Sequence, residues 1–307
     1  MIEIPENSNT LEAFERDLNP NDLGRASISA QVLGYGEIST VFAIGNDENH
    51  AFKRMPLFDS RLAAQTYAAD YRRYCGWLRD AGLKLPEDST EIIELPGRPV
   101  VLYIVQQQLR RDWFAHHLIH HITEEELELI ISLIVKEIVK VWRFNKEHQP
   151  ELELAIDGQL SNWVFTNDGT LYYVDTSTPL FRLSGEEQLD PELFLKSAPS
   201  FLRWIIRLFF LKDVMNRYYD PRQVFIDLAA NLHKEQRSDM VPKTVEIINR
   251  DLDSELDPLT VDEVEKYYKG DKIIWSLFLA FRRFDRWLKT TILRKRYEFI
   301  LPGKIKR

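Results

Sequence analysis

LGYGEISTV, at residues 33–41, is the segment from which the fold of this chain can be inferred. The glycines Gly34 and Gly36 favour a tight turn, because a residue without a Cβ lets the backbone bend closely. Apolar side chains alternate with other residues on both sides of the turn, with the two-residue period of a half-buried β-strand. A β-turn-β unit is therefore predicted, in which these residues alternate around the glycine turn: Ile28, Ala30 and Val32, then Val41 and Ala43.

Further strands and one helix follow this unit. Asn46–Asn49 has the composition of a hairpin tip, and His50–Met55 is predicted to be the returning strand. Glu91–Glu94 and Pro99–Gln106 are predicted as two more strands, joined by a Pro-Gly turn. Between them, Asp59–Asp80 is predicted to be a helix, because apolar or aromatic residues recur at helical spacing. These residues are Leu62, Tyr67, Tyr71, Tyr74 and Leu78.

The pattern becomes helical after about Arg110. Thr123–Glu126 fits a capping box at the start of a long helix that is expected to reach about Phe144. Asn167-Asp168-Gly169 between two short apolar runs predicts a β-hairpin, and most of residues 190–300 is predicted to be helical. The expected fold class is α+β, with an N-terminal extension (1–27), a small β-rich N-lobe (28–108) and a larger helical C-lobe (109–307).

The bulk composition sets the broad class of the protein. A chain of 307 residues, 44% of them hydrophobic, can bury a large core. Its single cysteine, Cys75, excludes an intrachain disulfide and favours a reducing environment, so a cytoplasmic location is expected. The first residues lack the basic-then-apolar order of a signal peptide, and no apolar run is long enough to predict a membrane-spanning helix.

Charge is distributed unevenly along the chain. The net charge is −8, but residues 282–307 carry +8 and the rest of the chain −16. Nucleic-acid binding is not indicated, because the chain as a whole is acidic. An apolar helical stripe runs into this basic segment, and it either packs on the C-lobe or meets an anionic membrane surface or an acidic protein. This stripe consists of Leu277, Phe281, Phe284, Leu288 and Ile292.

Four polar residues have types and intervals that suit phosphoryl transfer. Lys53 ends a predicted buried strand, Asp157 precedes Asn162 by five positions, and Asp175 follows Asn162 by 13 positions, across the predicted Asp-Gly hairpin. Phosphoryl transfer needs cradled phosphates, Mg²⁺ and an oriented nucleophile. A lysine supplies a point charge to phosphate oxygens, and neighbouring carboxylate and amide oxygens suit Mg²⁺. The four residues therefore predict one nucleotide site between the two lobes.

These motifs resemble those of the protein-kinase-like superfamily, nearest its small-molecule branch of aminoglycoside and choline kinase-like enzymes. The matching features are the glycine-containing turn, the strand lysine, the Asp157–Asn162 interval and the acid beyond a hairpin. They cover about residues 28–180. The resemblance implies a two-lobed kinase-like fold and an ATP- and Mg²⁺-dependent phosphotransferase that acts on a hydroxyl group of a small molecule.

The resemblance also implies a role for each matching residue. Asp157 would accept or orient the proton of the acceptor hydroxyl, Lys53 would hold the α- and β-phosphates, and Asn162 and Asp175 would bind Mg²⁺. The phosphate loop would contain Gly34, Gly36 and Ser39. The connector between the lobes would be Val105–Gln108, with Gln106 and Gln107 next to the adenine.

The chain departs from the family pattern at four places. Ser39 replaces the third glycine, and Ala155-Ile156 replaces the residues before the catalytic acid. Thr176-Ser177 follows the metal-binding acid, and the helix glutamate that pairs with the strand lysine is missing. Asp70 is the expected substitute for this glutamate, with Gln65 second. These departures leave two other functions open, namely a nucleotide-binding pseudokinase that serves as a regulatory or interaction module, and an enzyme that transfers a nucleotide.

Four histidines offer an alternative metal site. His116, His117, His120 and His121 form two pairs at i and i+4, the spacing that places two side chains on one helix face. They lack the glutamate of a zinc-protease helix, so a surface or lobe-junction helix is the main interpretation and a zinc site the alternative. Cys75 lies in the tyrosine-rich helix, where a buried, unreactive thiol is expected.

Overall fold

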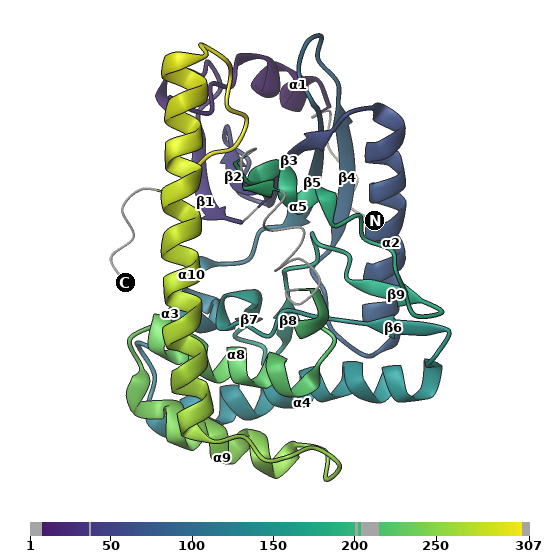
Figure 1. Cartoon of the computed structure of the whole chain (residues 1–307), viewed down its shortest axis with the longest axis vertical. Helices are drawn as coiled ribbons and strands as arrows, with labels where there is room; N and C mark the ends of the chain where they lie inside the picture. Colours follow the sequence, from purple (N-terminus) through teal and green to yellow (C-terminus); the bar gives the residue numbers. More distant parts are fainter. Residues whose placement is uncertain (1–7, 37, 200–201, 204–214, 303–307) are drawn as a thin grey trace.

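The computed structural model describes residues 8–36, 38–199, 202–203 and 215–302 (Figure 1). Its N-terminal part contains a five-stranded antiparallel sheet in the order β1-β2-β3-β5-β4. The alternating sequence around Gly34 and Gly36 forms β1 and β2, as predicted, and α2 follows β3. The elements are β1 (Ala30–Tyr35), β2 (Thr40–Ile44), β3 (His50–Phe58), α2 (Arg61–Asp80), β4 (Asp88–Ile93) and β5 (Val100–Gln107).

The C-terminal part is mainly helical and carries short strands at its boundary with the sheet (Figure 1). The predicted capping box is present: the Thr123 side chain accepts from Glu126 N–H, and the Glu126 side chain accepts from Thr123 N–H. The hairpin at Asn167–Gly169 joins β7 and β8 as predicted. The strands are β6 (Leu152–Leu154), β7 (Trp163–Phe165), β8 (Leu171–Tyr173), β9 (Phe181–Leu183) and β10 (Glu186–Glu187). The helices are α3 (Ala115–Leu118), α4 (Glu124–His148), α5 (Glu192–Ser197), α8 (Pro221–Lys234), α9 (Val241–Asp251) and α10 (Val261–Trp287).

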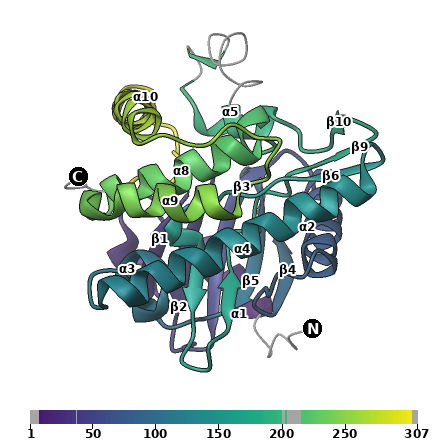
Figure 2. The same ribbon diagram turned by 90° about the horizontal axis from the view of Figure 1, so that it is seen from below.

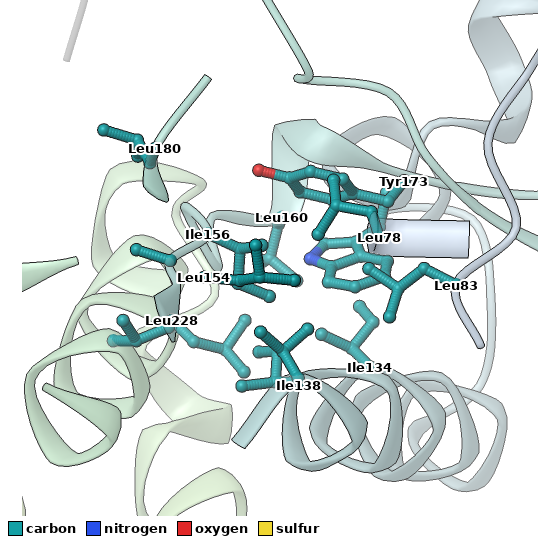
Figure 3. Close-up of a cluster of buried hydrophobic side chains, with 14 of the residues drawn as sticks. Leu78, Leu83, Ile134, Ile138, Leu154, Ile156, Leu160, Tyr173, Leu180 and Leu228 are labelled. Carbon is teal, nitrogen blue, oxygen red and sulfur yellow. The ribbon is translucent and has the colours of Figure 1, made fainter. Parts of the chain in front are cut away.

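The main hydrophobic core joins the inner face of the sheet to the helical part. Leu78 of α2, Ile134 and Ile138 of α4 and Leu228 of α8 converge on the short strands and loops between them (Figure 3). All four side chains are buried. This core therefore holds α2, α4 and α8 in fixed positions around the loops that carry Asp157 and Asp175, because close-packed interiors transmit displacements.

The outer face of the sheet has a second core. The helix α1 (Ser8–Asp17), within the predicted N-terminal extension, buries Leu11 and Phe14 against β2, β3 and β5. Ile300, near the other end of the chain, joins the same cluster. Figure 1 shows α10 running along one side of the molecule, with the following segment returning toward α1. Both ends of the described chain thus cover the outer face of the sheet.

A buried arginine organises this outer face. Arg54 on β3 binds both carboxylate oxygens of Glu15, at 2.6 and 2.7 Å, and also the carboxylate and backbone carbonyl of Glu298. Tyr103 donates a third hydrogen bond to Glu15. Burial alone would raise the pKa of Glu15, but Arg54 and Tyr103 outweigh it and hold this pKa below its usual value.

Candidate functional site

Lys53 and Asp175 form an ion pair between the sheet and the helical part. Lys53 Nζ lies 3.0 Å from Asp175 Oδ1 and 3.1 Å from Ser177 Oγ. Lys53 is buried on β3, whereas about a third of the Asp175 side chain is exposed. The two residues are 122 positions apart in the chain, so tertiary folding brings them together. In such a pair the partly exposed carboxylate can bind another cation, and the lysine ammonium group can then bind an anionic group.

The expected partner of Lys53 was wrong. Asp70 forms an ion pair with Arg73 on the same helix, and the acid beside Lys53 is Asp175. The side of α2 that faces the loops carries tyrosines. Asp70 lies next to this row of tyrosines and pairs with Arg73 rather than with Lys53. Gln65, the second expected substitute, is exposed.

The loop that carries Asp157 is held from several sides. Tyr74 on α2 donates to the carbonyl of Ala155 at 2.6 Å, and Asp157 N–H donates to the hydroxyl of Tyr173 at 3.2 Å. Gln159 binds the Asp157 carboxylate through its backbone N–H (3.0 Å) and through its side-chain amide (3.4 Å). The carboxylate is therefore oriented by the loop that follows it.

Asn162 connects the Asp157 loop to the Asp175 segment. Its side-chain amide donates to the backbone carbonyl of Asp157 at 3.1 Å, and its backbone carbonyl accepts from Val174 N–H at 2.9 Å. Asp175 is the next residue after Val174. The structure thus brings Lys53, Asp157, Asn162 and Asp175 into one network. Asn162 and Asp175 offer an amide and a carboxylate, a donor set that Mg²⁺ accepts when substrate phosphates and water complete its coordination.

Tyrosines from α2 hold the Asp175 segment in the same way. Tyr67 donates to the carbonyl of Ser177 at 2.8 Å, and Thr176 donates to the hydroxyl of Tyr71 at 3.4 Å. Burial raises the pKa of Tyr67 and Tyr71, so both hydroxyls keep their protons. The helical spacing of these tyrosines indicated only that they lie on the apolar side of the helix. Their hydroxyl groups could have indicated the contacts with the loops, since a buried tyrosine hydroxyl normally finds a hydrogen-bond partner.

The glycine turn lies on the same face of the sheet as Lys53. Gly34 is opposite Val41 on β2, and Val41 is opposite Lys53 on β3. Residues opposite one another share a face of the sheet. Because Gly34 has no side chain, this residue does not cover the face at the edge strand, beside Val41 and Lys53. Gly36 N–H donates to the carbonyl of Ser39, and a Cβ on Gly36 would lie 2.7 Å from Ser39 Oγ. Glu37, between them, lies outside the described residues.

Gln106 and Gln107 do not form the expected connector. Both belong to β5, where Gln106 pairs with Ala51 and Gln107 with His50. The link to the helical part begins at Gln108. The Gln106 side chain instead donates to Val174 O (3.3 Å) and Thr176 Oγ1 (3.1 Å), so it supports the Asp175 segment.

Gly158 lies where the Asp157 loop packs against two helices. A Cβ at this residue would lie 2.9 Å from Val224 Cγ1 on α8 and 3.2 Å from Ile138 Cδ1 on α4. Glycine is therefore required because the Asp157 loop approaches both helices closely. Nothing in the local sequence could indicate this, since the two neighbours come from distant parts of the chain.

A charged cluster lies between the Asp157 loop and a cavity. Lys234 on α8 is close to Asp227 (3.8 Å) and to Asp271 on α10 (3.2 Å). Burial by itself would lower the pKa of Lys234, but Asp227, Asp271 and Asp157 outweigh it and raise this pKa. Lys234 therefore remains charged and compensates part of the negative charge near Asp157.

The cavity lies between α8 and α10 and has a volume of about 400 Å³. Its walls include Arg217, Gln223, Tyr267 and Asp271. Tyr267 interacts with Asp227, which also interacts with the Gln159 side chain. Gln159 in turn binds the Asp157 carboxylate. The volume is in the range of small-molecule sites, and its lining combines charged and aromatic groups.

The histidines and the cysteine show no sign of metal chemistry or reactivity. His116 and His117 have ring centroids 4.0 Å apart, and burial, together with His117, Arg111 and His120, lowers the pKa of His116 to about 4. Within the described ranges, no three His, Cys, Asp or Glu side chains form a group suited to a metal ion. Cys75 is buried as predicted, and burial raises the pKa of its thiol to about 12.

Comparison with protein families extends over most of the chain. Residues 24–286 match the model of DUF6206, a family of unknown function. The chain belongs to the DUF6206 family. The matched region of this DUF6206 protein includes the sheet, both loops of the Lys53–Asp175 network and nearly all of α10. No curated protein matches the chain. In the part that the structure describes, every helix is too short or too polar to cross a bilayer.

Proposed function

We propose that this DUF6206 protein is a kinase-like phosphotransferase that uses ATP and Mg²⁺ and transfers a phosphoryl group to a hydroxyl of a small molecule. The observation that carries the proposal is the Lys53–Asp175 ion pair, joined through Asn162 to the loop of Asp157. A strand lysine, an Asp-x₄-Asn loop and a following acid are the parts that kinases use to hold ATP and its metal. The family model itself gives no activity.

Each residue has a defined task in this proposal. Lys53 binds phosphate oxygens of ATP, for which its buried ammonium group supplies a fixed positive charge. Asp157 accepts the proton of the acceptor hydroxyl, and its carboxylate is held for this task by Gln159. Asn162 and Asp175 hold Mg²⁺, which when bound would neutralise negative charge on the phosphates. Lys53 Nζ and Asp175 Oδ1 lie 3.0 Å apart, so the phosphate-binding and metal-binding groups of the proposed site are adjacent.

The cavity between α8 and α10 supports a small acceptor. It is about 400 Å³ in volume, and side-chain contacts lead from Tyr267 on its wall through Asp227 and Gln159 to the Asp157 carboxylate. Such a cavity accommodates a metabolite but not a folded protein. Its lining is mainly apolar with a few charged groups, which is typical of small-molecule sites.

The decisive experiment compares Asp175→Asn with Asp80→Asn, a matched change at an exposed acid on α2. ATP binding with Mg²⁺ is measured by thermal shift, and turnover by ADP release with a panel of small alcohols. The Asp175 variant is expected to lose metal-dependent binding and at least about 100-fold of turnover, the scale typical of a lost electrostatic contact at a reaction centre. Wild-type turnover in the Asp175 variant would exclude the assignment.

A pseudokinase is the second candidate function. The observation that favours it is that Lys53 pairs with Asp175 and Ser177, whereas the helix acid Asp70 pairs with Arg73. Tight ATP binding without ADP release under any acceptor condition would support this candidate. Product mass then separates phosphoryl transfer from nucleotide transfer, because the acceptor gains a different group in each reaction.

A further inference from the structure

The end of α10 and the turn of π-helix that follows it, η5 (Leu288–Ile292), expose large apolar side chains. Phe284, Trp287, Ile292 and Leu293 are 49%, 50%, 56% and 52% exposed. The rings of Phe284 and Trp287 lie against one another, with centroids 5.8 Å apart. The sequence left open whether the apolar stripe is buried, and the structure leaves Leu277, Phe284 and Ile292 of this stripe about half exposed.

Positive charge surrounds these side chains. From Arg282 to Arg296 the sequence contains seven Lys or Arg residues and one acid, Asp285. This acid is buried and pairs with Lys289. Arg294 and Lys295, next to the exposed Leu293, are exposed. The outward side of this segment therefore presents positive charge without neighbouring acids from the same segment.

We infer that this basic–aromatic surface (Phe284, Trp287, Ile292, Leu293, Arg294 and Lys295) binds an anionic bilayer. Tryptophan and other apolar side chains enter the boundary between headgroups and acyl chains, while lysine and arginine remain near the anionic headgroups. Figure 2 shows α10 end-on at the periphery of the molecule. A bilayer accepts the scattered apolar side chains without shape complementarity, whereas an acidic protein would need a matching pocket for each of them.

The test uses the full chain and sedimentation with phosphatidylcholine vesicles, with and without phosphatidylserine. Binding is expected only with phosphatidylserine and should weaken as salt is added, because salt screens the charges. Two variants remove the apolar and the charged component separately, Phe284→Ser with Trp287→Ser and Arg294→Glu with Lys295→Glu. Each is expected to weaken binding by at least about tenfold, since every basic residue near the surface contributes measurably.

A matched control changes an apolar–basic pair elsewhere. Leu62 is 72% exposed and follows the exposed Arg61 at the start of α2, so Arg61→Glu with Leu62→Ser should bind vesicles like the wild type. Melting curves verify that all variants are folded. Quenching of tryptophan fluorescence by brominated lipids should decrease in Trp287→Phe.

Three results would overturn the inference. The first is that the wild type does not bind phosphatidylserine vesicles, including the case in which it binds only an acidic polypeptide such as polyglutamate. The second is that both surface variants bind as well as the wild type. The third is that the Arg61/Leu62 control loses as much binding as they do.

Discussion

Single residues in the Asp157 loop are constrained by distant neighbours, and Gly158 is the clearest case. Gly158→Ala places a Cβ 2.9 Å from Val224 Cγ1, so α8 or the loop has to move. We expect a loss of about 1–3 kcal/mol in the free energy of unfolding, the usual cost of overpacking. Denaturant unfolding measures this change.

Gly76, inside α2, is the matched control for Gly158. A Cβ at Gly76 meets no atom within 4 Å. Gly76→Ala should therefore stabilise the protein by about 0.5–1 kcal/mol, because alanine favours the helix. If both variants change stability in the same direction, the close approach of the Asp157 loop to α4 and α8 is not the cause of the effect of Gly158→Ala.

His116 gives the protein a specific dependence on pH. Its pKa of about 4 in the folded state lies below the ordinary value of 6.5, so the unfolded state binds a proton first as the pH falls. Stability should consequently decrease between pH 6.5 and about 4, by up to about 3 kcal/mol from this residue. His116→Gln, which cannot titrate, should show a flatter stability curve across this range. Parallel curves for the two proteins would contradict the prediction.

At the scale of elements, α1 is attached to the sheet by the Glu15–Arg54 pair. Glu15→Gln removes one charge and leaves the buried Arg54 with Glu298 as its remaining charged partner. We expect the variant to lose about 3 kcal/mol of stability, as for other broken buried pairs. The double variant Glu15→Leu with Arg54→Met should recover much of this loss, because it leaves no uncompensated charge. Thermal unfolding of the three proteins tests this expectation, and a double variant less stable than Glu15→Gln would refute it.

Elements that depend on local rules could be predicted from the sequence. The capping box at Thr123, the α2 helix and the hairpin at Asn167–Gly169 follow from residue spacing and turn chemistry, and the structure contains them. The end of β5 could not be predicted, since Gln107 extends the strand by pairing with His50 from another strand.

One contact of the candidate site agrees with the sequence. Lys53 and Asp175, which were expected to lie close together, form an ion pair between β3 and the segment after β8. That these residues bind ATP and Mg²⁺ stays a prediction. The pairing of Asp70 was wrong, since the rotation of α2 about its axis depends on tertiary packing. That rotation directs Tyr67, Tyr71 and Tyr74 toward the loops.

At the scale of the whole molecule, the C-terminal segment packs on the outer face of the N-terminal sheet. Removing residues 297–307 takes away the buried Ile300 and Leu301 and the contacts of Glu298 with Arg54. Two buried aliphatic side chains correspond to about 3–6 kcal/mol. Hydrogen exchange of β2 and β3 should therefore accelerate more than that of α4 and α9. A chain that lacks only residues 303–307 is the control. Equal acceleration of exchange in all elements would contradict the prediction that the segment mainly stabilises the sheet.

The position of Arg54 also has a consequence for synthesis on the ribosome. This residue emerges early, but its partner Glu298 is translated 244 residues later. Until then the nascent sheet can pair Arg54 with Glu15 but still lacks Ile300 over its outer face. Nascent domains with exposed apolar surface are prone to misassembly, and chaperones recognise them. The N-terminal sheet is therefore translated early, but its outer face is covered only when the C-terminal segment has been synthesised.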